Sequence, residues 1–260
     1  MGKAKTNIVC FGNCQAMQLV RYFKTYLDPE QYEINLYSNY DKKFTTQETI
    51  DGIANADIVI YQPLSHEHKD LSADKISTIT DAKLISFPYI YNNGIYSLET
   101  DGTKIIGEDT ILALYKDGYT LEEIIKMQQN GQIDFKLKEK FQKSLNIMKE
   151  REKDLDIKIT DFIEKYYREV QLFLSHNHPT NIVFNEVFKQ IVNILDLKII
   201  NEKAAVPPLC ETVAPITIHD KNAHGYKWNP YRFHSVHASM VIIELIISRY
   251  VIKKNNFYMV

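Results

Sequence analysis

The chain has 260 residues, of which 45% are hydrophobic and 25% are charged. These values are typical of a globular protein and exclude a disordered or fibrous chain. The 31 Lys and Arg residues against 33 Asp and Glu residues leave a net charge of −2, which disfavours a general nucleic-acid-binding protein.

Strand and helix patterns alternate in the first part of the chain. Short apolar or alternating runs predict strands over 7–11, 32–37, 56–61 and 82–87. Helical spacing predicts helices over 14–27, 47–54 and 72–80, the last with Ser72 as its N-cap. Strands separated by helices of this length predict an α/β fold with a doubly wound parallel sheet. In such sheets, ligands bind beyond the carboxyl ends of the strands.

The pattern becomes helical in the second part. We predict helices over 109–116, 120–130, 135–173, 180–195 and 235–252, with a capping box formed by Thr120 and Glu123. Residues 197–200 are a candidate fifth strand, and residues 205–231 read as a long loop. We therefore predict a single α/β domain over 1–260, with core strands mainly in 1–95, a large helical insertion over about 105–200 and C-terminal helices.

Cysteine usage and apolar runs bear on location. Cys10, Cys14 and Cys210 cannot all pair, which favours a reducing compartment. No secretion signal is recognisable at the N-terminus, so we expect a cytoplasmic protein. The most apolar stretch, 239–252, is too short and too charged to span a bilayer, so we expect no integral membrane segment.

The sharpest motif is Gly-Asn-Cys-Gln at 12–15, between the first strand and the first helix. The positive end of a helix dipole favours anions and lowers the pKa of a thiol, so Cys14 lies where a nucleophile or an anion-binding turn is expected. Gly12 permits a tight turn, and Gln15 could donate to an oxyanion. A small buried cysteine at a strand end is an equally good explanation.

Histidines follow at two further loops. His66 and His68 come just after the third predicted strand, where a polar site residue or an exposed loop is favoured over a metal ligand. His178 stands in Ser-His-Asn-His-Pro at 175–179, just before a predicted helix. The segment is an elaborate N-cap on one interpretation; on the other, the helix dipole keeps the imidazole neutral and available as a base.

An aromatic run occupies residues 226–233 and contains Lys227 and Arg232. Exposed on the surface, it could stack an adenine or a sugar, and its two cations could pair with phosphate. As a plug covering the core, it would have no such role. The sequence leaves both alternatives open.

The order and spacing of several short motifs carry a family resemblance. They are Gly-Asn-Cys-Gln at 12–15, Ala-Asp-Ile-Val-Ile-Tyr-Gln-Pro at 56–63, the helical pair within 109–124, and Asn-His-Pro-Thr-Asn at 177–181. Together they span about residues 7–195 and resemble the WcbI-like family of polysaccharide-biosynthesis acetyltransferases. The resemblance implies an SGNH-like (flavodoxin-like) fold, binding of coenzyme A and acetylation of a sugar in capsular polysaccharide.

The chain departs from the SGNH pattern in three places. Cys14 stands where that pattern has its nucleophilic serine. The later Gly-x-Asn-Asp block has no match, so Gln62 or His66 would have to complete the oxyanion hole. The terminal Asp-x-x-His block is also absent, and His178 and His176 are the nearest candidates for the base.

These considerations predict three groups of site residues and no metal. The predicted catalytic residues are Cys14, His178 and His66. The predicted oxyanion- or anion-binding residues are Asn13, Gln15 and Gln62. The predicted cofactor-binding residues are Gly12, His68, Asn181, Lys227 and Arg232.

The predicted function is transfer of an acetyl group from acetyl-CoA to a sugar hydroxyl in capsular or other surface polysaccharide biosynthesis. The partners would be a small-molecule acyl donor and a sugar or glycan acceptor, without nucleic acid. Two alternatives stay open: an SGNH-type carbohydrate esterase, and a non-catalytic protein that binds a glycan or a nucleotide. The acceptor sugar, the acyl chain, the covalent role of Cys14 and the oligomeric state are left undetermined.

Overall fold

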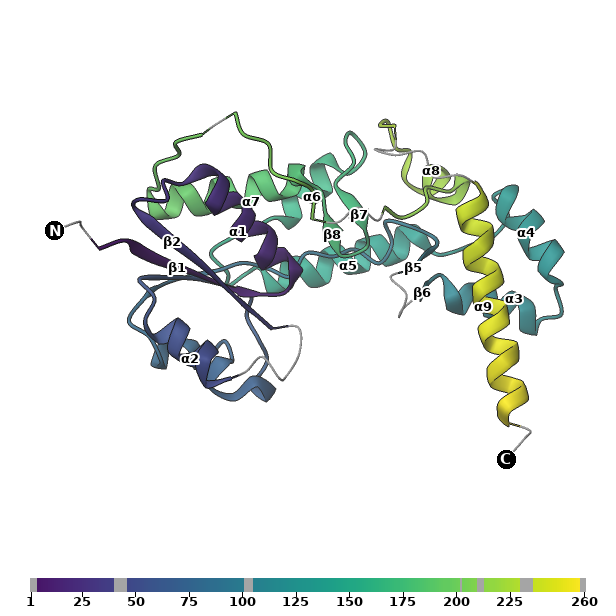
Figure 1. Ribbon diagram of the computed structural model, residues 1–260. Coiled ribbons are helices and arrows are strands. Elements are labelled where there is room, and N and C mark those ends of the chain that lie inside the picture. The colour runs from purple at the N-terminus through teal and green to yellow at the C-terminus, as the bar shows by residue number, and fades with distance from the viewer. Residues whose placement is uncertain are drawn as a thin grey trace. The chain divides into compact units, whose positions relative to one another are not determined.

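The computed structural model describes residues 4–39, 46–100, 105–201, 203–209, 213–229 and 236–257 (Figure 1). The chain divides into two compact units. Unit 1 comprises Met1–Ile90, Met148–Ile163 and Thr180–Leu209. Unit 2 comprises Tyr91–Ile147, Glu164–Pro179 and Cys210–Val260. A single domain over 1–260 stays a prediction beside this division.

Unit 1 contains a four-stranded sheet. Its strands are β1 (Thr6–Gly12), β2 (Tyr32–Ser38), β3 (Ile58–Tyr61) and β4 (Lys83–Ser86). They lie in the order β2-β1-β3-β4, and each neighbouring pair is parallel. The α/β class and the parallel sheet are thereby confirmed. Because the chain passes outward to β2 and then returns across β1 to β3, the order reverses beside β1, which is where such sheets bind ligands.

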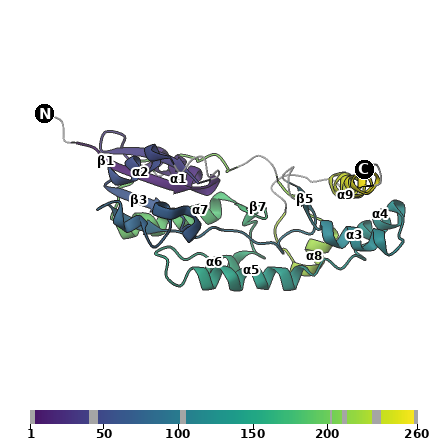
Figure 2. The same ribbon diagram turned by 90° about the horizontal axis from the view of Figure 1, so that it is seen from below.

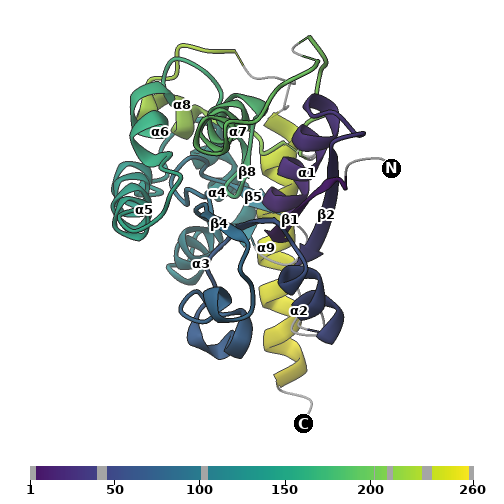
Figure 3. The same ribbon diagram turned by 90° about the vertical axis from the view of Figure 1, so that its left-hand side faces the viewer.

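Helices cover both faces of this sheet. Helices α1 (Cys14–Tyr26) and α7 (Asn181–Leu195) lie on one face and α2 (Gln47–Ala54) on the other (Figure 1). Figure 3 shows β1 and β2 side by side from another direction. Phe23 and Phe188 pack edge to face between α1 and α7, with ring centroids 5.4 Å apart.

The opposite face of the sheet has its own core. Alternate strand residues point to this face because side chains alternate along a strand. The buried members of the cluster come from β1, β3, α2 and the segment after β3: Val9, Phe11, Ile53, Val59, Leu71 and Ile76.

Two predictions for unit 1 are wrong. Residues 72–80 form no α-helix; they contain the short 3₁₀ helix Ile76–Thr78, and another 3₁₀ helix, His66–Leu71, precedes them. The local backbone bonds span three residues, as from the N–H of Thr78 to the carbonyl of Lys75 and from the N–H of Ile79 to that of Ile76, and such bonds close tighter turns than those of an α-helix. Residues 197–200 form no fifth strand, and the backbone N–H of Ile200 donates to the carbonyl of Tyr26 at the end of α1.

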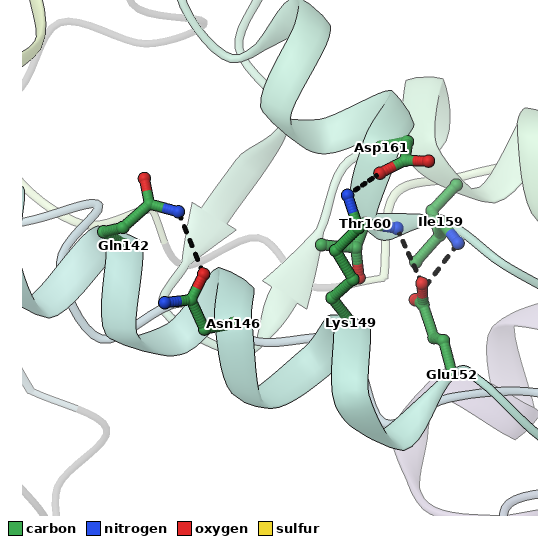
Figure 4. Close-up of polar contacts among 7 residues, drawn as sticks. All are labelled: Gln142, Asn146, Lys149, Glu152, Ile159, Thr160 and Asp161. Carbon is green, nitrogen blue, oxygen red and sulfur yellow. Dashed lines mark hydrogen bonds and ion pairs between the residues drawn. The ribbon is translucent and has the colours of Figure 1, made fainter.

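The long helix predicted over 135–173 is also wrong, because it is interrupted. Helix α5 (Leu137–Arg151) ends before the segment 152–159, and α6 (Thr160–Tyr166) follows (Figure 4). The buried Glu152 carboxylate accepts hydrogen bonds from the backbone N–H groups of Ile159 and Thr160, at 3.0 Å each. This carboxylate caps the start of α6.

Two further contacts hold the same region. The Asp156 carboxylate accepts both the backbone N–H and the hydroxyl of Ser86 on β4, at 2.7 Å each, so the interrupting segment is fastened to the sheet edge. Figure 4 also shows the Lys149–Asp161 ion pair and, on α5, the hydrogen bond from Gln142 to Asn146.

Unit 2 is mainly helical. Its elements are β5 (Glu99–Thr100), β6 (Ile105–Ile106), α3 (Glu108–Lys116), α4 (Leu121–Gln129), β7 (Phe173–Ser175), β8 (His178–Pro179), α8 (Ile218–His224) and α9 (Val236–Phe257). Helix α9 lies beside α3 and α4 (Figures 1 and 2), where Ile243 and Ile246 pack on Ile111 and Ile124. Among the helices of the described part of the chain, none is both long and apolar enough to cross a bilayer.

Most predicted helices of unit 2 are confirmed, including the capping box of Thr120 and Glu123. The expectation that 205–231 is one long loop is wrong, because α8 lies within it. Asp220 makes a second capping box with Thr217 and also accepts the backbone N–H of Ser97 at 2.7 Å. The helix is therefore held by partners that are distant in the sequence.

Candidate functional site

The turn between β1 and α1 is built around Gly12 and Asn13. The Asn13 side chain caps α1 by accepting the backbone N–H of Gln15 at 2.9 Å. A Cβ atom on Gly12 would lie 2.8 Å from Oε1 of Gln62 and 2.9 Å from Cβ of Ala16. Only glycine therefore fits between the strand end and these side chains.

Cys14 is the first residue of α1 and is partly buried. Its position at the N-terminus of a helix of 13 residues is the one the sequence predicts, where the helix dipole favours a thiolate. Cys10 differs from it in position and burial: its side chain is fully buried within β1, and burial raises the pKa of its thiol. Of these two cysteines, only Cys14 is placed for chemistry.

Two buried glutamines join the carboxyl ends of β1, β3 and β4. Gln62, just after β3, accepts the backbone N–H of Asn13 on Oε1 at 3.0 Å and donates from Nε2 to Oε1 of Gln15 at 3.1 Å. Gln15 in turn donates to the carbonyl of Ile90 at 2.7 Å and accepts its N–H at 3.0 Å. The three loop segments that the switch-point rule selects are thus tied together in unit 1.

This network gives Gln15 and Gln62 a structural role. Their exposed fractions are 0% and 4%, and their side-chain amides donate to acceptors within the protein. Donation to an oxyanion would require either side chain to give up such a bond. The oxyanion role of Gln15, Gln62 and Asn13 therefore stays a prediction, with positioning of the turn as the role that the geometry favours.

Asn181 opens α7 and is similarly engaged. Its Oδ1 accepts from Nε2 of Gln18 at 3.1 Å, and its Nδ2 donates to the carbonyl of Val206 at 2.6 Å. Gln18 is fully buried and also donates to the carbonyl of Pro207 at 2.7 Å. These contacts hold residues 206–207 against α1 and α7, and the predicted cofactor contact of Asn181 would compete with them.

His66 and His68 lie in the 3₁₀ helix after β3. The His66 side chain is 89% exposed and pairs with Asp74 at 3.2 Å. The backbone N–H of His68 donates to the carbonyl of Ser65. In the residues that the structure describes, no group of three or more His, Cys, Asp and Glu side chains could hold a metal ion. Their predicted roles in catalysis and cofactor binding stay predictions.

His178 stands at a pocket in unit 2. Strands β7 and β8 form an antiparallel hairpin that sets Ser175 opposite His178, with Oγ 2.5 Å from Nδ1. Both residues line a pocket of about 480 Å³. The segment is thus a hairpin more than a helix cap, and Thr180 is the N-cap of α7.

Glu99 and His176 form a buried pair next to this hairpin. The Glu99 carboxylate accepts the backbone N–H of His176 at 2.7 Å and contacts its Nδ1 at 2.6 Å. Glu99 is 3% exposed and also lines the pocket. Sequence reasoning missed Glu99, because 77 residues separate it from His176 and no local pattern marks it.

The two predicted phosphate-binding cations are not both described. Lys227 is exposed and pairs with Glu169 at 2.7 Å, whereas Arg232 lies outside the described residues. In the same run, Tyr226 stacks on His224 with centroids 5.1 Å apart, and Trp228 lies 4.5 Å from Tyr226. For Tyr226 and Trp228, the structure favours the aromatic plug.

Comparisons with known proteins add two findings. The family described as "Polysaccharide biosynthesis enzyme WcbI" matches this chain over residues 7–102 and 107–199. A solved structure of WcbI, called a novel polysaccharide biosynthesis enzyme and described as native protein without a disulfide bond between coenzyme A and one of its cysteines, is similar to this chain with a TM-score of 0.65. The two chains are 17% identical, and the match covers 94% of this chain and 91% of the other. No curated protein sequence matches.

The structural likeness extends over nearly the whole length of both chains, and at this identity it bears on the fold alone. The family match, in contrast, includes the turn at 12–15, Gln62 and the hairpin with His178. From this match we conclude that the chain belongs to the WcbI family of polysaccharide biosynthesis enzymes.

Proposed function

We propose that this enzyme transfers an acetyl or other acyl group from a coenzyme A thioester to a sugar hydroxyl of a capsular or other surface polysaccharide. The family supports polysaccharide biosynthesis, and the similar WcbI structure, which is described in relation to coenzyme A, supports the donor. The observation that carries the proposal is the environment of His178. Its imidazole lines a pocket of ligand size and is oriented by a hydroxyl partner.

Counting hydrogens on Ser175 indicates the tautomer of His178. A serine hydroxyl has one hydrogen, and Ser175 Oγ is placed to donate it to Oδ1 of Asn177 at 3.2 Å. Ser175 then accepts from Nδ1–H of His178, which leaves the lone pair on Nε2. That tautomer is the one a general base requires. We assign the proton in this way from the hydrogen-bond network.

In the direct route, Nε2 of His178 takes the proton of the sugar hydroxyl while the hydroxyl oxygen attacks the thioester carbonyl. The C–S bond breaks, and the thiolate of coenzyme A leaves and accepts a proton. In a two-step route, the Cys14 thiolate attacks the thioester carbonyl and displaces the thiolate of coenzyme A. The sugar hydroxyl then gives its proton to a base and attacks the acyl-cysteine, which releases the Cys14 thiolate. We also propose that the fold is SGNH-like and that the protein is cytoplasmic. Lys227 and Arg232 would bind the phosphate groups of coenzyme A.

The first experiment measures binding and transfer separately. Calorimetry with coenzyme A and acetyl-CoA tests the donor, and we expect heat of binding with at least one of them. Acetyl transfer to sugar acceptors is then compared for wild type, His178→Gln and His66→Gln. Loss of a general base costs about 10²- to 10⁴-fold, and we expect this loss for His178→Gln only. A loss of this size in His66→Gln instead would assign the base to His66.

A second experiment distinguishes the two routes. If Cys14 carries the acyl group, Cys14→Ala abolishes transfer, and mass spectrometry of wild type incubated with acetyl-CoA finds the acetyl group on Cys14. Full activity of Cys14→Ala would eliminate the covalent route and leave the direct one. Binding of coenzyme A serves as the control that the variant is folded.

A carbohydrate esterase is the second candidate, favoured by the same pocket. A general base beside a partly apolar pocket would activate water as well as a sugar hydroxyl. This function predicts turnover of an aryl acetate without coenzyme A, and hydrolysis that His178→Gln abolishes. Acyl transfer that depends strictly on coenzyme A would exclude it.

A further inference from the structure

The pocket beside His178 is larger than an acetyl group requires. Its volume of about 480 Å³ lies within the range of roughly 300–1,000 Å³ that is typical of small-molecule sites. An acetyl group would leave most of this space to water. Pockets of this volume hold ligands much larger than a two-carbon group.

The lining of the pocket is polar at one side and apolar elsewhere. Ser175, His178, Glu99 and Thr100 supply its polar groups, and six residues supply its apolar wall: Val213, Ala214, Pro215, Ala238, Val241 and Ile242. Both oxygens of the Glu99 carboxylate contact His176, so this carboxylate is paired within the protein. The lining thus combines one reactive end with an aliphatic body.

Phosphate does not suit this lining. Among the described residues that line the pocket, none is Lys or Arg, and phosphate groups are bound by cations or by exposed backbone N–H groups. These lining residues therefore favour the acyl part of the donor over its nucleotide part. An uncharged aliphatic chain that ends in a carbonyl fits the pocket best.

The apolar wall is held in place by secondary structure. The backbone N–H of Ala214 donates to the carbonyl of Leu174 on β7 at 2.6 Å, which fastens 213–215 to the hairpin of His178. Ile242 is 6% exposed and belongs to the core of unit 2, which fixes α9. Val241, its neighbour on α9, is 47% exposed at the pocket. A bound aliphatic chain would cover this side chain.

We propose that the pocket lined by His178 and Val241 binds the acyl chain of the donor thioester, and that this chain is longer than acetyl. The inference rests on the proposed acyltransferase function and specifies its substrate class. His178 stands at the polar end, where the carbonyl would lie, and the aliphatic wall receives the chain. Each methylene that leaves water improves binding by up to about fourfold.

The test uses thioesters that lack the nucleotide. Hexanoyl- and acetyl-N-acetylcysteamine are titrated into the full chain, and binding is followed by calorimetry or ligand-observed NMR. We expect the hexanoyl thioester to bind at least about tenfold more tightly. Equal affinities would overturn the proposal. With coenzyme A thioesters, the same preference is expected in kcat/KM for transfer.

Val241→Asp locates the binding site. Its exposed position tolerates a charge, and a carboxylate at the pocket wall disfavours an aliphatic chain. We expect this variant to lose the preference for hexanoyl. Ile252→Asp is the matched control, because Ile252 is 59% exposed on the same helix and does not line the pocket. A preference that persists in Val241→Asp would overturn the assignment to this pocket.

The two proposals fail in different ways. Tight binding of the hexanoyl thioester without any acyl transfer would remove the proposed function and leave the acyl pocket. Acetyl transfer by an enzyme that does not discriminate between the two chain lengths would retain the function and remove the acyl pocket.

Discussion

Gln62 occupies a position where one side chain joins three loop segments. It accepts from the backbone of Asn13 and donates to Gln15, which in turn binds both backbone groups of Ile90. Because Gly12 has no Cβ atom, the side chain of Gln62 packs directly against the end of β1. The orientation of the first turn of α1, where Cys14 lies, depends on these amide contacts.

Replacement of this glutamine is therefore expected to be costly. In Gln62→Ala, the Asn13 N–H loses its acceptor and a small cavity forms, and we expect a loss of about 2 kcal/mol in the free energy of unfolding. Urea titration measures it. Gln47→Ala is the matched control: Gln47 is exposed on α2, where its side chain donates to Asp51 at 2.8 Å, so a change within about 0.5 kcal/mol is expected. Equal losses in both variants would contradict the structural role of Gln62.

The residues of the site differ in how far the sequence reveals them. Cys14 was predictable, because a glycine-containing turn between an apolar run and a helical pattern is a local signal. The position of Gln62 just after the third strand was predictable, but its bonds to Asn13 and Gln15 depend on the order of strands in space. Glu99 had no signal, because its partner His176 comes from a distant hairpin.

At the scale of elements, secondary structure set by local patterns was predictable, and secondary structure set by distant contacts was not. Strands and helices with strong periodicity, such as β1 and α7, lie close to their predicted bounds. The break at 152–159 was not predicted, because no local signal in this highly charged stretch marks the end of a helix. Asp156 binds Ser86 on β4, and Glu152 caps α6. Contacts made across the fold therefore override a helical pattern there.

The cap on α6 gives a prediction for that segment. Glu152→Ala leaves two buried N–H groups, those of Ile159 and Thr160, without their acceptor, and each such group costs about 1–3 kcal/mol. We expect a loss of about 2 kcal/mol or more in the free energy of unfolding. Glu150→Ala removes only the exposed pair with Lys153, and such surface pairs contribute about 0–1 kcal/mol. Hydrogen exchange should also be faster at Ile159 and Thr160 in Glu152→Ala alone; unchanged exchange would contradict the cap.

At the scale of the whole molecule, the net charge near zero does not reveal that folding buries three ionisable side chains of unit 2: His219, His224 and Asp220. The Nε2–H of His224 donates to the carbonyl of Gly94 at 2.7 Å, and that of His219 to the carbonyl of Gln128 at 3.1 Å. Burial lowers the pKa of both imidazoles. Burial also raises the pKa of the Asp220 carboxyl, to about 6.

These shifts have opposite consequences for stability. A lowered histidine pKa means that the unfolded chain takes up protons first as pH falls below about 6.5. The stability that neutral His219 and His224 contribute is present above that pH and is lost on acidification. A raised Asp220 pKa acts in the other direction: its contribution is present below about pH 4 and is lost as pH rises through about 6. The pH dependence of the total unfolding free energy therefore combines the histidine and Asp220 contributions, and a variant is needed to separate them.

His224→Gln separates them, because glutamine can donate to the carbonyl of Gly94 and does not titrate. Asp220 is present in wild type and in the variant, so its contribution cancels when the two are compared. We expect wild type to lose more unfolding free energy than His224→Gln between about pH 7.5 and pH 5.5, since only wild type has a buried imidazole at this position. NMR of the imidazole carbons gives an independent measurement. If the His224 ring of the folded protein titrated at pH 6.5, the two proteins would lose stability equally, and if it titrated above pH 6.5, wild type would lose less than the variant; either result would contradict the lowered pKa.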